Sequence, residues 1–185
     1  VSCHSCESCL SGNDHHCRSY GLYGETEDGT EVEYRLVPEL NLLPKPASLS
    51  FEEAASIPLT FLTAWHMLVD KAGVRAGQTV LVLAASSGVG SAGVQIAKLF
   101  GARVITTVGT EDKIEKARGL GADHVIDTSR QEISAEVKRV TDRRGVDIVV
   151  EHVGAATWEQ SLKALAFGGK IVTCGATTGP NVSIN

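Results

Sequence analysis

An apolar run, a glycine-rich turn and a helix-like segment follow one another near the middle of the chain. Thr79–Ala84 is apolar at every position after the first, as expected for a strand buried on both faces of a parallel sheet. Gly88, Gly90 and Gly93 then follow in the spacing G-x-G-x-x-G. The overlapping segment Ser91–Phe100 has the apolar periodicity of a helix. This junction predicts a strand–turn–helix unit whose backbone comes close to a ligand, and it constrains the fold more than any other feature.

The alternation of strand and helix continues toward the end of the chain. Further strands are expected at Arg103–Val108, His124–Ile126, Asp147–His152 and Lys170–Cys174. Helices are expected at Leu62–Lys71, at Glu111–Leu120, from a capping box at Ser129–Glu132 to about Thr141, and after a cap at Thr157. This pattern predicts an α/β fold, a doubly wound parallel-sheet Rossmann domain. Such a sheet usually has six strands and five are found, so we expect either an internal piece of a longer protein or elements supplied by a partner chain.

The first part of the chain is built differently. It is rich in Cys, His, Gly and Pro, and within it only Glu31–Val37 alternates in the manner of a strand. Leu43–Ala47 contains two prolines and has the composition of a linker, and the capping box Ser50–Glu53 then predicts the start of a helix. We therefore expect a small domain at 1–47 and a nucleotide-binding domain at 48–185.

Four of the five cysteines lie within the first 17 residues. Cys3, Cys6, Cys9 and Cys17 are spaced C-x2-C-x2-C-x7-C, and four thiolates form a closed tetrahedral zinc site with no open position for substrate. Such a metal would stabilise a lobe that is too small for a core of its own. Metal-free cysteines and an iron–sulfur cluster are the alternatives. The remaining Cys174, at a strand end, is expected to be a small buried hydrophobe.

The glycine-rich turn is expected to bind a dinucleotide, because the amides and dipole at a helix N-terminus favour phosphate. Counted from the end of the strand, Ala85 makes the tight turn and Ser87 lets the backbone approach the pyrophosphate. Gly90 permits close packing of the helix on the strand, and Gly88 adds an unhindered amide. The alternative is that these glycines only pack a helix against a sheet.

The choice between cofactors depends on residues about 20 positions further on, where an acid would bind the ribose 2′-hydroxyl. The second strand instead ends in Val108–Thr110, and Glu111 and Asp112 lie inside the next helix, whose N-terminus they stabilise. A 2′-phosphate is therefore not repelled, and Thr110 and Lys113 are available to bind it. These residues favour NADP(H) over NAD(H).

Composition excludes some partners and favours others. The net charge is −5, basic residues are scattered and aromatic residues make up 5%, which argues against nucleic-acid binding. No apolar run approaches the roughly 18 residues of a membrane span, and the start lacks the features of a secretory signal. We expect a cytoplasmic protein with a small-molecule substrate, acting as a homodimer or homotetramer.

Taken together, the motifs resemble the medium-chain dehydrogenase/reductase superfamily of zinc-containing alcohol dehydrogenases and quinone oxidoreductases. The resemblance rests on Cys3-x-x-Cys6-x-x-Cys9-Leu10-x-Gly12-x4-Cys17, Glu53-Ala54-Ala55-x-Ile57-Pro58-x4-Thr63-Ala64 and Ser86-Ser87-Gly88-Val89-Gly90-x4-Gln95. These segments cover nearly the whole chain in order. The resemblance implies that residues 1–47 are part of a GroES-like catalytic domain, of which the chain holds the zinc lobe and the return strand.

The resemblance also implies roles for individual residues. Thr63 would lie near the nicotinamide, Ser87 and Val89 would contact the cofactor, and Lys113 would sit near the adenosine ribose. The cleft would be bordered by residues at the carboxyl ends of later strands, namely His152, Val153, Cys174 and Gly175.

One departure from the family pattern affects the expected chemistry. Leu59 stands where zinc alcohol dehydrogenases have a third ligand to a catalytic zinc, and leucine cannot bind a metal. The other ligands would precede Val1, so no catalytic residue is assigned. We expect an NADP(H)-dependent oxidoreductase of the quinone-oxidoreductase-like branch, acting on a quinone, enone or other carbonyl substrate. The alternatives are a zinc-dependent alcohol dehydrogenase, a non-catalytic nucleotide-binding or structural module, and a zinc-ribbon nucleic-acid binder.

Overall fold

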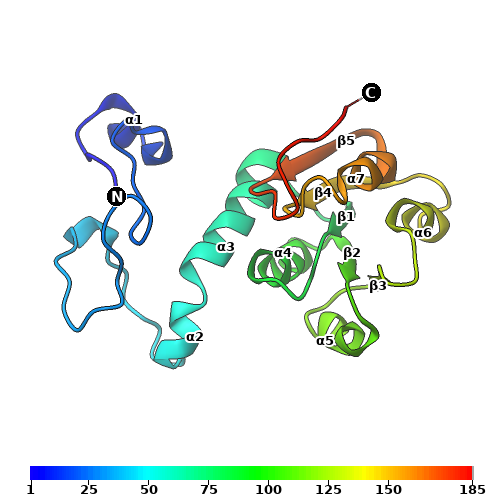
Figure 1. Ribbon diagram of the computed structural model, residues 1–185, viewed down its shortest axis with the longest axis horizontal. Coiled ribbons are helices and arrows are strands. Elements are labelled where there is room, and N and C mark those ends of the chain that lie inside the picture. Colours follow the sequence, from blue (N-terminus) through cyan, green and yellow to red (C-terminus); the bar gives the residue numbers. More distant parts are fainter. Residues whose placement is uncertain (185) are drawn as a thin grey trace. The chain divides into compact units, whose positions relative to one another are not determined.

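The computed structural model describes residues 1–184, and the chain divides into two compact units, Val1–Ser48 and Leu49–Asn185 (Figure 1). The first unit contains the short helix α1 (Glu7–Leu10) and two single 3₁₀ turns, η1 (Asp14–His16) and η2 (Glu39–Asn41). Cys17 and Gly21 are the only buried residues of this unit. The first unit is therefore a set of loops with almost no apolar interior.

The strand expected at Glu31–Val37 is not formed, so this prediction was wrong. Val32, Tyr34 and Leu36 supply the apolar half of the alternation, and all three are exposed. An isolated extended segment leaves its backbone donors and acceptors to water and is not stable as a strand. Alternation alone predicted the strand, but no neighbouring strand in Val1–Ser48 pairs with it.

The second unit is built on a five-stranded parallel sheet in the order β3-β2-β1-β4-β5. The strands are β1 (Thr79–Val82), β2 (Arg103–Val108), β3 (His124–Asp127), β4 (Val146–Glu151) and β5 (Leu165–Thr173). All four residues of β1 are buried, as expected for a central strand covered on both faces. The strand order reverses between β1 and β4, which confirms the predicted Rossmann-like α/β sheet.

Helices cover both faces of this sheet. The helical elements of the second unit are α2 (Phe51–Ala55), α3 (Pro58–Trp65), the π-helix η3 (His66–Ala72), α4 (Gly88–Leu99), the 3₁₀ turn η4 (Glu111–Lys113), α5 (Ile114–Gly119), α6 (Ile133–Val140) and α7 (Trp158–Ala164). One apolar cluster joins Val94 of α4 and Ala117 of α5 to the sheet, and a second joins Val137 of α6 and Ala164 of α7 to it. The helices on the two faces therefore pack against separate halves of the core.

The helix starts show which local sequence rules hold. The capping box at Ser50 is present: its hydroxyl accepts the Glu53 amide at 3.1 Å, and the Glu53 carboxylate accepts the Ser50 amide at 2.8 Å. The predicted cap at Ser129 was wrong, because α6 begins after Glu132, whereas Thr157 does precede the first residue of α7 but its side chain does not cap the helix. The Ser129 and Thr157 hydroxyls donate instead to the carboxylates of Asp127 and Glu151. A buried acceptor nearby outcompetes the helix terminus for the hydroxyl.

The helix expected from about Leu62 begins earlier, at Pro58. Proline is well suited to the first position of a helix because its missing amide would have no partner there. Helix α3 continues directly into the π-helix, which ends at Gly73 with a φ of +68°. Pro58 is therefore the first residue of this helix, after a break that separates it from α2.

Candidate nucleotide-binding site

The turn after β1 lies at the carboxyl ends of the parallel strands, with β2 and β4 on either side. Ala84 makes the sharp bend with a φ of +49°, and its amide donates to the Thr107 hydroxyl at 2.8 Å. The prediction that Ala85 makes this bend was wrong, because β1 ends at Val82, before the expected Ala84. A left-handed alanine is strained, so the surrounding contacts hold this conformation in place.

Helix α4 begins directly after the bend with two amides that have no acceptor. The Ser87 hydroxyl accepts the amide of Gly90 at 3.0 Å and so caps the helix. Among the hydrogen bonds of the described residues, none takes up the amides of Gly88 and Val89. The positive end of the helix dipole and two available donors thus coincide at one point, which is the arrangement that binds a phosphate group.

Two glycines of the turn are required by packing. A Cβ at Gly90 would overlap the carbonyl oxygen of Ala84, as expected for close packing of the helix on the strand. A Cβ at Gly88 would lie 2.6 Å from the methyl group of Thr60 on α3. The contact with α3 was not visible in the sequence, so Gly88 has a packing role besides its available amide.

A hollow of about 370 Å³ lies beside the turn, over the ends of β2, β3 and β4. Of the predicted cofactor contacts, only Val153 lines it. Sequence reasoning missed the other lining residues, although their positions directly after predicted strands could have identified several of them. They are Ala84, Thr107, Val108, Gly109, Thr128, Gln131, Glu132, Ile133, Ala156, Thr157 and Gln160.

A second hollow of about 270 Å³ is lined by Ser86 of the turn and by Lys113 and Lys116. The two nearby acids are engaged elsewhere. Glu111 forms an ion pair with Arg130 at 2.7 Å, and the Thr110 hydroxyl is the main cause of a lowered pKa at Asp112. Lys113 therefore lines a hollow that Lys116 also lines, whereas Thr110 is already hydrogen-bonded to a carboxylate.

The remaining predicted cofactor contacts are dispersed over three elements. Thr63 is half-buried on α3, and the His152 ring lies 2.9 Å from the Leu83 carbonyl oxygen through Nε2. Cys174 and Gly175 follow β5 and are exposed. The prediction of a buried Cys174 was wrong, because β5 is an edge strand within the described sheet and its end is not covered.

The four N-terminal cysteines are brought together. Their sulfur atoms all lie within 4.8 Å of one another, with Cys3 to Cys9 at 3.8 Å and Cys6 to Cys9 at 3.5 Å. A tetrahedral zinc with Zn–S bonds of about 2.3 Å separates its sulfurs by about 3.8 Å. Backbone amides of Cys3 and Ser19 also approach the Cys17 sulfur, at 3.4 and 3.3 Å, as amides do around metal-bound thiolates. The donor set fits a closed zinc site.

The acidities of the thiols are consistent with such a site. Hydrogen bonds from the Ser5 backbone and hydroxyl lower the pKa of Cys3 to about 5. The Cys9 backbone lowers the pKa of Cys6, but contacts with the Cys9 and Cys3 thiols outweigh it and raise that pKa to about 11. One thiolate thus opposes the ionisation of its neighbour, and a divalent cation would remove this conflict.

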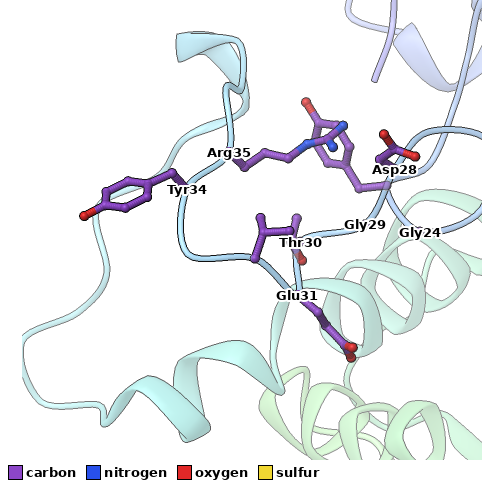
Figure 2. A pocket seen from close by; sticks show the side chains of 9 residues that line it. Gly24, Asp28, Gly29, Thr30, Glu31, Tyr34 and Arg35 are labelled. Carbon is purple, nitrogen blue, oxygen red and sulfur yellow. The ribbon is translucent and has the colours of Figure 1, made fainter.

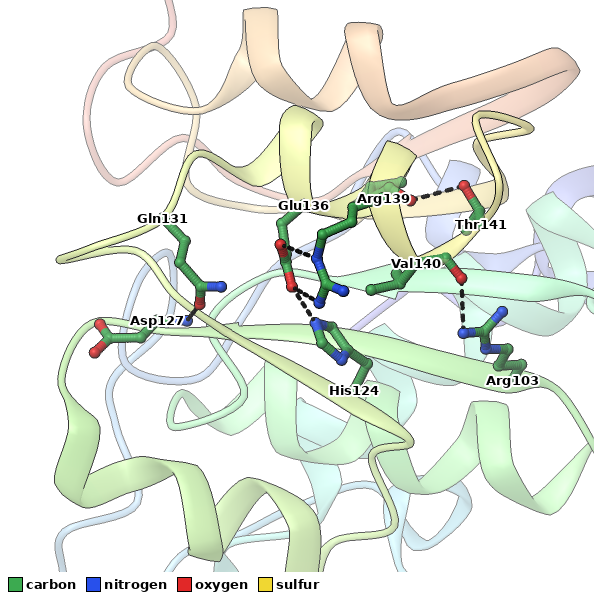
Figure 3. A network of polar contacts seen from close by, with 9 residues as sticks. Arg103, His124, Asp127, Gln131, Glu136, Arg139, Val140 and Thr141 are labelled. Carbon is green, nitrogen blue, oxygen red and sulfur yellow. Dashed lines mark hydrogen bonds and ion pairs between the residues drawn. The ribbon is translucent and has the colours of Figure 1, made fainter.

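Each of the two units has a further polar feature. In Val1–Ser48 a hollow of about 770 Å³ is lined by loop residues, where Arg35 stacks 4.7 Å from the Tyr23 ring centre and Tyr34 points away (Figure 2). In the second unit, Glu136 of α6 accepts from His124 at 2.8 Å and from Arg139 at 2.9 Å (Figure 3). The Arg139 guanidinium is the main cause that lowers the pKa of Glu136 to about 2. His124 begins β3, so this network lies at the amino ends of the strands, opposite the glycine turn.

Comparison with known proteins decides the family. Residues 88–185, more than half of the chain, match the sequence model of the zinc-binding dehydrogenase family. The chain belongs to this family. It is thus a member of the medium-chain dehydrogenase/reductase superfamily, as the three motif segments had suggested.

The relatives of this chain are longer than the chain itself. A quinone oxidoreductase-like protein 2 homolog of Nematostella vectensis is 36% identical over 171 residues, which are 91% of this chain and 46% of that protein. The crystal structure of an NAD-dependent alcohol dehydrogenase superposes with a TM-score of 0.94 at 54% identity, covering 97% of this chain and 52% of that one. A mycobacterial protein complexed with NADPH has a TM-score of 0.71 at 38% identity, with coverages of 76% and 44%. The chain therefore spans about half the length of these relatives.

The names of the first two of these relatives are those of oxidoreductases, and one of the related structures is a complex with NADPH. None of the helices within residues 1–184 has the length and apolar character that crossing a membrane requires.

Proposed function

We propose that this chain is the cofactor-binding part of an enzyme that transfers a hydride between a nicotinamide dinucleotide and a quinone, enone or other carbonyl or alcohol substrate. The observation that carries the proposal is the pair of acceptor-free amides of Gly88 and Val89 at the start of α4. They lie where the strand order reverses, which is where doubly wound folds bind their ligands. The reaction is proposed for the whole protein, of which this chain corresponds to about half.

With the diphosphate at the start of α4, the two ends of the cofactor would extend in different directions. The adenosine would occupy the 370 Å³ hollow over β2, β3 and β4. The nicotinamide would extend toward Thr63, His152, Cys174 and Gly175. The cofactor supplies the hydride, and the chain supplies binding and orientation. We assign no proton donor.

We further propose a preference for NADP(H). Lys113, Lys116 and Ser86 line the second hollow, of about 270 Å³, and a 2′-phosphate would gain charge-assisted hydrogen bonds there. Glu111, the first acid after β2, is paired with Arg130, so its carboxylate is already engaged. The related structures differ in the cofactor that their titles name, so the proposal rests on these residues.

Residues 1–47 are proposed to be part of a GroES-like domain whose cysteine lobe holds one structural zinc. Cys3, Cys6, Cys9 and Cys17 would hold the ion, and four sulfur ligands leave no position for a substrate. The zinc would therefore stabilise the lobe and take no part in hydride transfer. The enzyme is proposed to be cytoplasmic and to act as a homodimer or homotetramer.

A second candidate function is that of a zinc-dependent alcohol dehydrogenase, favoured by the 54% identity to an NAD-dependent alcohol dehydrogenase. Such an enzyme would hold two zinc ions per intact chain, whereas the first candidate holds one. Leu59, which is largely exposed on α3, offers no ligand to the second ion. Zinc content per chain separates the two functions.

Titration with NADPH and with NADH tests the cofactor proposal. We expect NADPH to bind about tenfold more tightly, as one good phosphate contact would give. Lys113→Glu should remove this preference, whereas Lys138→Glu, the same charge change on the exposed face of α6, should not. Tighter binding of NADH would contradict the preference, and failure to bind either dinucleotide would contradict the proposed function.

A further inference from the structure

Glu151, the last residue of β4, is a fully buried carboxylate at the carboxyl end of the sheet. Its Oε1 atom accepts the backbone amides of Val153 at 2.7 Å and Gly154 at 3.0 Å. Its Oε2 atom accepts the hydroxyls of Thr157 at 3.0 Å and Ser161 at 2.6 Å. Every hydrogen-bond partner of the carboxylate thus acts as a donor: two backbone amides, which can only donate, and two hydroxyls, which can also accept.

These bonds determine the shape of the loop between β4 and α7. Because its amides at Val153 and Gly154 point inward to Glu151, two of its carbonyl groups are left to bind elsewhere. The His152 carbonyl accepts the Thr177 hydroxyl at 3.0 Å, and the Val153 carbonyl accepts the Thr178 amide and hydroxyl, both at 2.7 Å. The loop after β4 is therefore bonded to the segment that follows β5.

The close approach of these two segments depends on a glycine that Glu151 holds. Gly154 has a φ of +93°, and a Cβ there would lie 2.6 Å from the Gly179 carbonyl oxygen. The Ala155 amide donates to the same carbonyl at 3.0 Å. A single buried side chain therefore supports a continuous connection from β4 to residues 176–179.

We propose that Glu151 is the positioning residue of the nicotinamide end of the site. It holds the loops after β4 and β5, which carry His152, Val153, Cys174 and Gly175, in the arrangement that receives the cofactor. The inference rests on the proposed function, because the site it shapes is the proposed nicotinamide site. Glu151 itself touches no cofactor and acts through these loops.

Glu136 provides an internal comparison. It is also a buried glutamate with a full set of hydrogen bonds, but its partners His124 and Arg139 lie at the amino ends of the strands (Figure 3). If loss of any buried carboxylate weakened cofactor binding, substitution of Glu136 and substitution of Glu151 would have the same effect. The proposal assigns that effect to Glu151 alone.

The test compares two substitutions of nearly equal volume. Glu151→Met removes both acceptors and leaves the Val153 and Gly154 amides unpaired. Glu151→Gln keeps one acceptor for these amides and presents an NH2 group to Thr157 and Ser161, whose hydroxyls can rotate to accept it. Ser161→Ala, which removes a single bond, replaces the methionine variant if that variant does not fold. Glu136→Gln is the control.

Two measurements are made on the full chain: amide hydrogen exchange at Thr178, which bonds to Val153 and not to Glu151, and the affinity for NADPH. We expect Glu151→Met to accelerate exchange and weaken NADPH binding, each by about tenfold, and Ser161→Ala to shift both less in the same direction. Glu151→Gln and Glu136→Gln should leave both near the unsubstituted values.

Unchanged exchange at Thr178 in a folded Glu151→Met chain would overturn the proposal. So would equal losses of NADPH affinity in the methionine and glutamine variants, because the hydrogen bonds would then not be the cause. If the unsubstituted chain binds neither dinucleotide, the proposed function fails and the positioning role fails with it, whereas exchange at Thr178 still decides whether Glu151 holds the two loops together.

Discussion

The two units of this chain differ in what stabilises each of them internally. In Leu49–Asn185, helices on both faces cover a sheet whose central strand is completely buried. In Val1–Ser48, only Cys17 and Gly21 are buried, and the feature that gathers distant residues is a group of four sulfur atoms. One unit is stabilised by apolar burial and the other is proposed to depend on a zinc ion, so each should fail under conditions that the other survives.

Removal of the proposed zinc should have the largest effect and should act on the first unit alone. Structural zinc contributes on the order of 10 kcal/mol in small metal-dependent folds. Cys9→Ser, or a strong chelator, should release the ion and unfold Val1–Ser48. Trp65 and Trp158 both lie in the second unit, so their fluorescence should show its unfolding transition unchanged. Unchanged zinc content in Cys9→Ser would show that the four cysteines do not form the site.

Substitution of Gly90 should destabilise the second unit and leave the first unaffected. A Cβ at this position overlaps the Ala84 carbonyl, so Gly90→Val should destabilise the second unit by about 3 kcal/mol or more and leave zinc content unchanged. Denaturant unfolding followed by tryptophan fluorescence measures this. Gly119→Ala is the control, because nothing lies near its Cβ and alanine favours a helix. A well-tolerated valine at position 90 would contradict the close helix–strand packing.

Acid should destabilise the second unit through protonation of Glu136. Its pKa is lowered to about 2, chiefly by Arg139, from an unfolded value near 4.5. A lowered carboxyl pKa contributes stability above the unfolded pKa that is lost as the pH falls through the folded one. The second unit should therefore lose about 2 kcal/mol between about pH 4.5 and pH 2, after a discount for the exposed Arg139. Glu136→Gln should flatten this dependence, and an unaltered slope would exclude the network as its source.

The smallest expected effect is a gain in stability. Ala84 has a φ of +49°, a conformation that favours glycine, so Ala84→Gly should stabilise the second unit by about 1 kcal/mol. The same denaturant experiment detects it. A loss of stability would mean that contacts of the Ala84 methyl group outweigh the backbone strain.

The difference between the units also explains what the sequence could predict. The apolar run of β1, the alternation after it and the spacing of the glycines predicted the sheet, because buried strands and helices impose a period on their residues. The cysteine spacing predicted the gathering of four sulfur atoms, because ligands to one ion must lie close together. Both predictions rest on rules that act over short stretches of chain.

The errors arose where distant contacts decide the local structure. Glu31–Val37 alternates like a strand but has no partner to pair with. Thr157 resembles a helix cap, yet its hydroxyl is taken by Glu151. Gly88 was explained by its amide alone because the packing of Thr60 against it depends on where α3 lies. No pattern in the sequence encodes these neighbours.

The central claim is that the acceptor-free amides at the start of α4 bind the diphosphate of a nicotinamide dinucleotide. Amide resonances of the isotope-labelled chain, followed during titration with NADPH, test it directly. The account predicts that the amides of Gly88 and Val89 move most and become protected from exchange. Binding that leaves these two amides unperturbed, or no binding of either dinucleotide, would contradict it.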